Sequence, residues 1–449
     1  KFIDTLINKE NKYNSLIDFL EKKFPNIEGI KAGEKIIQSN DFIKEIPRII
    51  SNLNNSYIYI QGPPGTGKTY QASNAIIELL KQKKKIAITA LSHKVIHNLL
   101  QKVEDMAKEK QFKIIGYKRG NLEDEDTIFN GDFIKTHEKD PIFMNALKIN
   151  DAGQIFAGTK YHLASSYYDN KIDYLFIDEA GQLSLADLIS IGNIAKNIVL
   201  IGDQNQLGQP IKGTHPNESG QSILDYLLEG RDTIPENRGI FLNKTYRLHS
   251  KINEFISSNF YEGRLNCDER TDKRIIKFNK KCIIQKPGVH YIEMNHKNNV
   301  QTSLEEIETV VDLMKQMIGS EFNDNGKKRE LNVKDFLIIS PYNTQVNLMI
   351  SKLEEEKIKN PRVGTIDKFQ GQEAPINIIS MTSSDSETLP RNKEFFFSKN
   401  RLNVAISRAQ VASIILFNPK ILDFFPKDIN QIKLVNNFFK LLDYKVKEH

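Results

Sequence analysis

A glycine-rich segment with a lysine and a threonine has the residue types and spacing to bind nucleotide phosphates. In the P-loop pattern GxxxxGK[ST], backbone N–H groups surround phosphates, the lysine reaches the terminal ones, and the hydroxyl binds magnesium. An apolar run over residues 56–60 precedes the segment and a helical pattern follows it, which is the strand-loop-helix context that the motif requires. We therefore expect a nucleotide and Mg²⁺ site in which Lys68 is catalytic and Thr69 is a metal ligand. The segment comprises Gly62, Pro63, Pro64, Gly65, Thr66, Gly67, Lys68 and Thr69.

Two carboxylates follow a second apolar run. The run over residues 172–177 ends directly before Asp178 and Glu179. Open parallel sheets bind ligands in the crevice at the carboxyl ends of their strands. We expect Asp178 to hold the magnesium shell and Glu179 to polarise the attacking water. The alternative is an acidic pair that ends a strand only for solubility, and the nearby P-loop disfavours it.

An amide and two arginines could complete the phosphate chemistry. Gln206 follows the run over 197–202, and its uncharged amide could touch both the γ-phosphate and the attacking water. A turn without a catalytic role is the alternative. Arg247 lies in KTYRLHS and Arg408 in NVAISRA. Phosphoryl transfer spreads negative charge over the γ-phosphate oxygens, which a delivered arginine stabilises. We expect both arginines to be catalytic, although either one alone could be a surface ion pair.

The elements that must position these residues recur at α/β spacing. Helical patterns separate the apolar runs, as crossovers between parallel strands require. The pattern predicts an α/β fold with two domains in series. The runs lie at 56–60, 85–90, 154–159, 172–177 and 197–202, then at 288–294, 335–340, 362–366, 376–381 and 413–417.

The same pattern predicts the limits of the domains. A chain of 449 residues is too long for one hydrophobic core. A charged, poorly periodic stretch over about 104–150 is expected to be an insertion in the first domain. The predicted order is a helical lead-in, two α/β domains and a helical C-terminal segment, at 1–50, 51–240, 241–420 and 421–449.

Composition and charge restrict the kinds of partner that the chain could bind but do not identify one. The net charge of +6 permits nucleic acid but does not require it. Cys267 and Cys282 lack metal-ligand spacing, which argues against a disulfide framework, structural zinc or an iron-sulfur site. No apolar run reaches membrane-span length, and no signal-peptide pattern opens the chain. We expect a soluble intracellular monomer, with a bacterial cytosol favoured. Because the chain begins at Lys1, we expect its natural N-terminus to lie upstream.

Six motifs, taken in order, resemble those of one family. GPPGTGKT, DEAGQ, GDQNQL, TYRLHS, VGTIDKFQGQE and NVAISRA are similar to the motifs of superfamily 1 helicases of group B. That group includes the nonsense-mediated-decay and Okazaki-fragment-processing enzymes, and the resemblance covers about residues 56–417. It implies two tandem RecA-like domains, with parallel sheets and helices on both faces, that sandwich ATP. It also implies translocation in the 5′-to-3′ sense on a single strand.

The resemblance implies further roles. Tyr246 would stack on adenine, and Glu373 would face the nucleotide. Segments at 92–100 and 261–265 are similar to bacterial proteins in which such a helicase follows a RecB-like nuclease, which would lie outside this chain. Hydroxyls and amides suit phosphate and sugar contacts with a strand. The implied nucleic-acid contacts are Thr89, Ser92, His93, Lys94, Thr159, Pro341, Asn343 and Thr365.

Some features depart from the family pattern. The glutamine that reads adenine has only Gln38 and Gln61 as candidates, Ser250 stands where the family usually has proline, and the accessory barrel cannot be located. Residues 340–345 alone could be an ordinary strand-to-helix turn. The sequence predicts an ATP- and Mg²⁺-dependent motor on single-stranded nucleic acid, with DNA favoured. The alternatives are an RNA helicase of the same mechanism, a nucleotide-gated clamp or scaffold that does not unwind, and an NTPase without a nucleic-acid partner.

Overall fold

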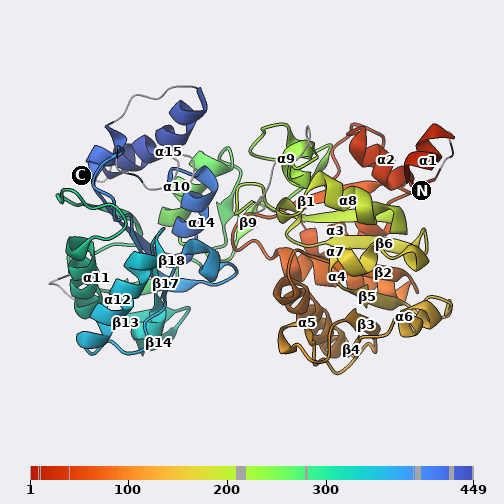
Figure 1. The fold of residues 1–449 in the computed structure, drawn as a ribbon, viewed down its shortest axis with the longest axis horizontal. Coiled ribbons are helices and arrows are strands. Elements are labelled where there is room, and N and C mark those ends of the chain that lie inside the picture. Colours follow the sequence, from red (N-terminus) through yellow and green to blue (C-terminus); the bar gives the residue numbers. More distant parts are fainter. Residues whose placement is uncertain are drawn as a thin grey trace. The chain divides into compact units, whose positions relative to one another are not determined.

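The computed structural model divides the chain into two compact units, both visible in Figure 1. It describes residues 2–8, 10, 12–39, 41–208, 219–278, 282–387, 389, 396–423 and 429–446. The first unit comprises Lys1–Gly62, Gly67–Gln204 and Gly208–Leu242. The second comprises Pro63–Thr66, Asn205–Leu207 and Asn243–His449. Two short loop segments from the first half of the chain therefore group with the second unit.

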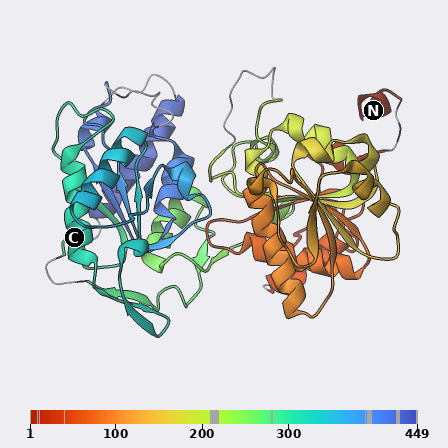
Figure 2. The ribbon, with the colours of Figure 1, turned by 60° about the horizontal axis from the view of Figure 1, so that its bottom comes forward.

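The first unit is built on a parallel sheet. Among the described residues it has eight strands in the order β4-β3-β5-β2-β6-β7-β1-β8. Central strands such as β1 are buried along their whole length, because helices cover both faces of the sheet (Figure 2). The strands are β1 (Tyr57–Gln61), β2 (Lys85–Thr89), β3 (Ile115–Arg119), β4 (Ile134–His137), β5 (Gln154–Ala157), β6 (Ile172–Ile177), β7 (Ala195–Gly202) and β8 (Gly239–Phe241).

The helices of the first unit follow from apolar stripes and caps. The helix over His93–Glu109 begins where Ser92 accepts a hydrogen bond from the Val95 N–H. The helix over Leu185–Ile191 begins with a capping box of Ser184 and Asp187. The helices are α1 (Phe2–Ile7), α2 (Asn14–Leu20), α3 (Phe42–Ser51), α4 (Lys68–Lys81), α5 (His93–Glu109), α6 (Asp140–Ala146), α7 (Lys160–Leu163), α8 (Leu185–Ile191) and α9 (Ile223–Leu228), with short 3-10 turns at η1 (Glu125–Thr127), η2 (Ser166–Tyr168), η3 (Ala180–Gln182) and η4 (Gly192–Ile194).

The stretch 104–150, expected to be an insertion in the first domain, contains regular structure that the sequence pattern did not predict. It contains the last turns of α5 and two strands, β3 and β4, that extend the same parallel sheet beyond β5. Glu104 is 1% exposed, and its carboxylate accepts the N–H groups of Asp132, Phe133 and Ile134 at 2.7 to 2.9 Å. This buried carboxylate anchors the chain that enters β4. Both strands are short and carry charged residues, so they lack the apolar runs that reveal the other strands of the sheet, which is why the pattern missed them.

The second unit has its own parallel sheet, with five strands in the described part, in the order β12-β18-β17-β15-β16. The expected architecture of two parallel α/β sheets, as in tandem RecA-like P-loop domains, is confirmed. The strands are β12 (Gly288–Glu293), β15 (Phe336–Ile339), β16 (Val363–Gly364), β17 (Ala374–Ser380) and β18 (Ala409–Phe417). The helices are α10 (Ser250–Phe260), α11 (Leu304–Met317), α12 (Asn343–Glu355), α14 (Lys399–Ile406) and α15 (Ile429–Val446), with 3-10 turns at η5 (Val333–Asp335), η6 (Ile366–Phe369) and η7 (Pro419–Leu422).

Two small sheets accompany the second unit. One pairs β9 (Lys244–Thr245) with β10 (Asn266–Cys267), and the other is an antiparallel group of β11 (Arg274–Lys277), β13 (Glu321–Asp324) and β14 (Lys327–Glu330). Burial raises the pKa of the Cys267 thiol to about 11 and also raises that of Cys282. Throughout the described residues, no helix combines the length and the apolar character needed to cross a membrane.

Candidate functional site

The P-loop joins β1 to α4 with the backbone geometry of a phosphate cradle. Gly65 and Gly67 have φ angles of +74° and +80°, and α4 begins at Lys68. Alternating backbone conformations of this kind turn successive N–H groups toward one point, and the helix N-terminus favours negative charge there. Lys68 Nζ donates to the Gly62 carbonyl at 2.6 Å, so the lysine is folded back over the loop.

The tip of the P-loop is packed against the TYRLHS segment, and both belong to the second unit. Thr245 Oγ1 donates to the Pro64 carbonyl at 2.8 Å, and the Tyr246 N–H donates to the Gly65 carbonyl at 2.8 Å. A Cβ atom on Gly65 would lie 2.3 Å from Arg247 Cβ and 2.7 Å from Thr245 Oγ1. Only glycine fits at this position, because a side chain would meet both strain and collision. The packing brings Tyr246 and Arg247 beside the loop.

The two acids lie at the end of β6, as the sequence predicted. Asp178 is 5% exposed, and its carboxylate accepts the Glu179 N–H at 2.9 Å. Burial raises the pKa of Asp178 above its usual range, the Glu179 charge adds to that effect, and the Lys68 charge opposes it. Glu179 has a φ of +51°, a conformation that costs a non-glycine residue about 1 kcal/mol and that clusters at functional sites.

Thr69 and Asp178 have the side chains expected around a magnesium ion that also binds phosphate. Magnesium takes oxygen ligands and usually needs only one or two carboxylates from the protein, with phosphates and waters completing its shell. Thr69 on the first turn of α4 and Asp178 supply a hydroxyl and a carboxylate of this kind. In the described part of the chain, no group of three or more His, Cys, Asp or Glu side chains is arranged to hold a metal ion.

Gln61 supports the loop that follows β7. Its Nε2 donates to Gln204 Oε1 at 3.0 Å, and its Oε1 accepts the Ile234 N–H at 2.7 Å. Tyr59 also donates to Gln204 Oε1, at 3.1 Å. Gln61 is 0% exposed, so its amide is occupied inside the first unit and is not placed to read adenine. Of the two sequence candidates for that role, Gln38 is exposed.

Arg247 and Glu373 form an ion pair in the second unit. Arg247 Nε donates to Glu373 Oε2, and Arg247 Nη1 donates to the Ser407 carbonyl at 3.3 Å. Gln410 Nε2 donates to the other Glu373 oxygen at 2.8 Å. Burial alone would raise the pKa of Glu373, but the Arg247 charge and these hydrogen bonds lower it. The glutamate therefore stays ionised and fixes the arginine.

Arg408 is interior, and Tyr246 is exposed. Arg408 is 2% exposed, and its Nη1 donates to the Gln372 carbonyl at 3.2 Å, so it is not a surface ion pair. The ring of Tyr246 is 45% exposed, which leaves an aromatic face for stacking, and the Arg270 guanidinium lies 5.2 Å from its centre. Arg274, which the sequence reasoning missed, donates to the carbonyls of Tyr246 and Arg247 at 3.2 and 2.8 Å.

The predicted nucleic-acid contacts of the first unit follow β2 and β5, whose carboxyl ends share one edge of the sheet. Ser92 and Lys94 at the start of α5 are exposed, and Thr159 precedes α7. Thr89 is 0% exposed, so its hydroxyl is not available on this surface. His93 Nδ1 lies 2.7 Å from Lys118 Nζ, and burial lowers the pKa of Lys118 to about 8.

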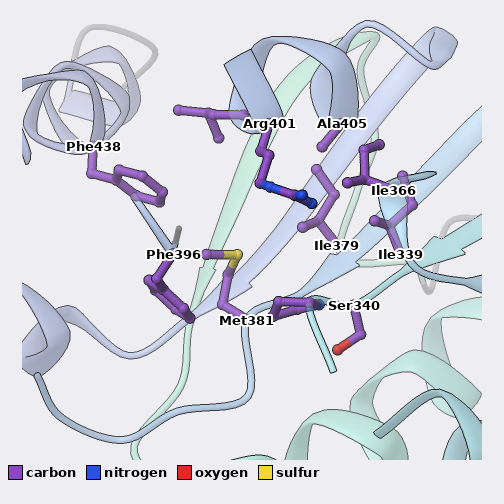
Figure 3. Close-up of a pocket in the computed structure, with 11 residues that line it drawn as sticks. Ile339, Ser340, Ile366, Ile379, Met381, Phe396, Arg401, Ala405 and Phe438 are labelled. Atoms are coloured by element: carbon purple, nitrogen blue, oxygen red, sulfur yellow. The ribbon is translucent and has the colours of Figure 1, made fainter. Parts of the chain in front are cut away.

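The predicted contacts of the second unit surround a pocket at the carboxyl ends of β15 and β17 (Figure 3). Pro341 forms part of its wall, and Ile366, next to Thr365, forms another part. Asn343 begins α12 and is exposed. Arg401 is the one charged side chain in the lining, and its Nη1 donates to Asp367 at 3.2 Å. The sequence did not reveal this pocket, because its apolar walls come from five separate segments.

The predicted residues divide between the two units. The first unit carries Gly62, Gly67, Lys68, Thr69, Thr89, Ser92, His93, Lys94, Thr159, Asp178 and Glu179. The second unit carries Pro63, Pro64, Gly65, Thr66, Gln206, Tyr246, Arg247, Pro341, Asn343, Thr365, Glu373 and Arg408.

Comparison with known proteins gives matches over both units. Residues 47–211 and 220–420 each match a family model described as an AAA domain. The DNA replication ATP-dependent helicase/nuclease dna2 of Schizosaccharomyces pombe is 28% identical over 391 residues, which cover 80% of this chain and 26% of that protein. The DNA polymerase alpha-associated DNA helicase A of Saccharomyces cerevisiae is 25% identical, over 91% of this chain and 70% of that protein.

Two further matches are to another yeast helicase and to a viral helicase. The ATP-dependent helicase NAM7 of Saccharomyces cerevisiae is 26% identical, over 80% of this chain and 40% of that protein. A crystal structure of the arterivirus nonstructural protein 10 helicase has a TM-score of 0.43 at 14% identity, over 89% of this chain and 64% of that one, too low a score to carry an argument. The chain spans about a quarter, 26%, of the length of the Schizosaccharomyces pombe dna2 protein. The motif order, the two parallel sheets and the sequence matches make the chain similar to superfamily 1 helicases of the Upf1 and Dna2 group.

Proposed function

We propose that this chain is the motor of a 5′-to-3′ helicase that uses ATP and Mg²⁺ to move along single-stranded DNA as a monomer. The observation that carries the proposal is the division of the phosphate chemistry between two units. The first holds Lys68 and the residues suited to bind the metal and to activate water. The second holds the tip of the phosphate loop, Pro63–Thr66, and the residues suited to stabilise charge on the γ-phosphate.

Each group has a defined part in the proposed reaction. Gly62–Thr69 would hold the phosphates, while Thr69 and Asp178 would hold Mg²⁺, which neutralises phosphate charge when bound. Glu179, at the end of β6, would accept a proton from the attacking water. Arg408 and Gln206 would contact the γ-phosphate. Arg247 would stabilise charge beside it, held by its ion pair with Glu373.

The proposed domains keep the limits read from the sequence. Residues 51–240 and 241–420 form the two RecA-like domains, flanked by segments 1–50 and 421–449. Tyr246 stacks on adenine, and Glu373 acts on the nucleotide through Arg247. The resemblance of residues 92–100 and 261–265 implies a RecB-like nuclease domain or partner outside this chain. The first two relatives described above carry DNA in their names, which supports DNA over RNA as the track.

The strand would cross the carboxyl edges of both sheets. On the first unit it would contact Ser92, His93, Lys94 and Thr159, whereas Thr89 is wholly buried and would not touch it. On the second it would contact Pro341, Asn343 and Thr365. Side chains of these types bind phosphate and sugar without reading bases. The contacts would therefore hold a strand of any sequence.

The proposal is tested by steady-state ATPase activity without nucleic acid, with single-stranded DNA, and with single-stranded RNA of the same sequence. The Lys68→Ala variant serves as the blank. We expect stronger stimulation by DNA, and stronger stimulation by RNA would assign the other polymer. A rate that neither strand changes would overturn the motor.

Polarity and movement need a second assay. A duplex with a 5′ single-stranded tail should be unwound and a duplex with a 3′ tail should not. Unwinding from the 3′ tail alone would reverse the polarity. Strand-stimulated hydrolysis without unwinding of either duplex would favour a nucleotide-gated clamp.

A further inference from the structure

The loop that carries Gln206 includes two adjacent residues, Gln204 and Asn205, that belong to different units. Gln204 belongs to the first unit, where its Oε1 accepts hydrogen bonds from Tyr59 and Gln61 at 3.1 and 3.0 Å. Asn205 belongs to the second unit, where its Nδ2 donates to the Phe260 carbonyl at 2.7 Å. Gln206 therefore follows the residues of the second unit, although its loop begins at a strand of the first.

Asn403 on α14 fixes the second-unit part of this loop. Its Nδ2 donates to the Asn205 carbonyl at 2.7 Å and to the Tyr261 hydroxyl at 2.8 Å. Asn403 and Tyr261 are both 0% exposed, and Asn205 is 3% exposed. A primary amide supplies two N–H donors from one nitrogen, so this one side chain can serve both acceptors. Water cannot replace a partner in so buried a place.

The helix that carries Asn403 also leads to Arg408. Helix α14 ends at Ile406, and Arg408 follows it directly before β18. Arg408 is 2% exposed and is fixed through Nη1 to the Gln372 carbonyl at 3.2 Å. The loop of Gln206 and the segment of Arg408 are thus attached to the same short helix. Neither can shift far unless α14 shifts with it or the Asn403 bonds break.

We propose that Asn403 is a positioning residue that joins Gln206 and Arg408 into one body, so that both approach and leave the γ-phosphate together. The inference rests on the proposed function, because it assumes that these two side chains contact the γ-phosphate. It adds that Gln206 and Arg408 of the second unit respond to the γ-phosphate together and not independently of each other. Loss of that phosphate after hydrolysis would release both at once.

The first test compares Asn403→Ala with a matched control, Asn418→Ala. Asn418 is 1% exposed in the same unit, and its Nδ2 donates to the His296 carbonyl at 2.8 Å, away from the Gln206 loop. Both variants lose a buried amide-to-carbonyl hydrogen bond, and their melting temperatures should fall alike. Asn403→Ala should lower the kcat of ATP hydrolysis on the order of tenfold or more, with a change in ATP KM of less than about threefold. Asn418→Ala should leave both values near those of the wild type.

A double-mutant cycle separates positioning from a loss of stability. If Asn403 acts through Gln206, the Asn403→Ala and Gln206→Ala effects on kcat should not multiply, because each disables the same contact. Multiplicative effects, or a normal kcat in Asn403→Ala, would overturn the inference. If Asn403→Ala fails to fold, Tyr261→Phe removes one acceptor and keeps the ring. It should lower kcat about two- to threefold through the loosened amide, and an unchanged kcat would count against the proposal.

The outcome is distinguishable from a failure of the proposed function. An absence of stimulation by any strand in the wild-type protein would overturn the motor. The kcat comparison can still be made in basal ATP hydrolysis without a strand. A motor that unwinds normally with the Asn403→Ala substitution would overturn only the inference about Asn403.

Discussion

The first unit places its predicted phosphate and metal ligands directly after strands of one sheet, whereas the second unit holds its predicted groups by contacts between side chains. Lys68 and Asp178 follow β1 and β6, which are separated only by β7 in the sheet. Arg247, by contrast, is fixed by Glu373 and by the Ser407 carbonyl. A sheet edge is rigid, but ion pairs and single hydrogen bonds can exchange partners. We expect the first unit to supply the lysine, the metal ligands and the group that activates water, and the arginines of the second unit to stabilise the transition state of hydrolysis.

The largest effects are expected at two residues of the first unit, Lys68 and Glu179. Lys68→Ala should abolish turnover because it removes the side chain that reaches the terminal phosphates. Glu179→Gln should lower single-turnover hydrolysis on the order of 10³-fold, because an amide cannot accept the proton from water. Glu179→Gln should still bind a fluorescent ATP analogue with near-normal affinity. Normal hydrolysis by Glu179→Gln would show that the general base lies elsewhere.

The second prediction tests whether the second unit controls rate. Arg408→Ala should lower kcat on the order of 10³-fold with little change in ATP KM, because a delivered arginine acts on the transition state. Arg408→Lys should not restore the rate, since lysine lacks the planar fork of donors. Steady-state kinetics with saturating strand measures both values. A kcat near that of the wild type for Arg408→Ala would remove it from the catalytic set.

The third prediction concerns the P-loop tip, where the second unit holds part of the phosphate loop. Gly65→Ala should weaken ATP binding on the order of tenfold or more, because Cβ would lie 2.3 Å from Arg247 Cβ at a φ of +74°. Gly319→Ala is a matched control, with a φ of +85° and no atom within 4 Å of an added Cβ. It should lose only about 1 kcal/mol of folding stability. Equal ATP affinities in the two variants would show that the neighbours of Gly65 can accommodate the added Cβ without disturbing the phosphate loop.

The smallest expected effect is at Tyr246. Tyr246→Ala should raise the KM for ATP about fivefold, by loss of a stacking contact of about 1 kcal/mol, and Tyr246→Phe should stay within about twofold of the wild type. The KM for GTP should rise together with that for ATP, since every base has a face to stack and Gln61 is engaged elsewhere. A change for one nucleotide alone would reveal a base-reading group near Tyr246.

The parts of the fold that depend on contiguous residues could be predicted from the sequence. The run over 172–177 is strand β6 with the same limits, because every residue except Asp173 is buried and carries an apolar or aromatic side chain. The P-loop motif likewise depends on contiguous residues. Strands β3 and β4 were missed because they are short and carry charged residues. The carboxylate that anchors the start of β4, Glu104, lies about 30 residues away from the N–H groups that it accepts.

Parts of the candidate site that depend on distant partners could not be predicted. Asn403 bonds to Asn205, and Arg274 to the carbonyls before Leu248, across separations that no local pattern records. Thr89 shows a different case, since the family resemblance implied a nucleic-acid contact but its side chain is wholly buried. The types of the site residues could be predicted from the sequence, whereas the pairing of buried amides depends on the folded structure.

The two cysteines make the chain suited to fluorescent labelling. A thiol with a pKa of about 11, like that of Cys267, has on the order of one thiolate in ten thousand at neutral pH, whereas an ordinary exposed thiol has a few per cent. Cys282 is buried, and its pKa is also raised. A maleimide dye should therefore select a newly introduced surface cysteine over both native ones. Dye pairs attached to the first and second units could then follow the distance between them through each turnover, without removal of either native thiol.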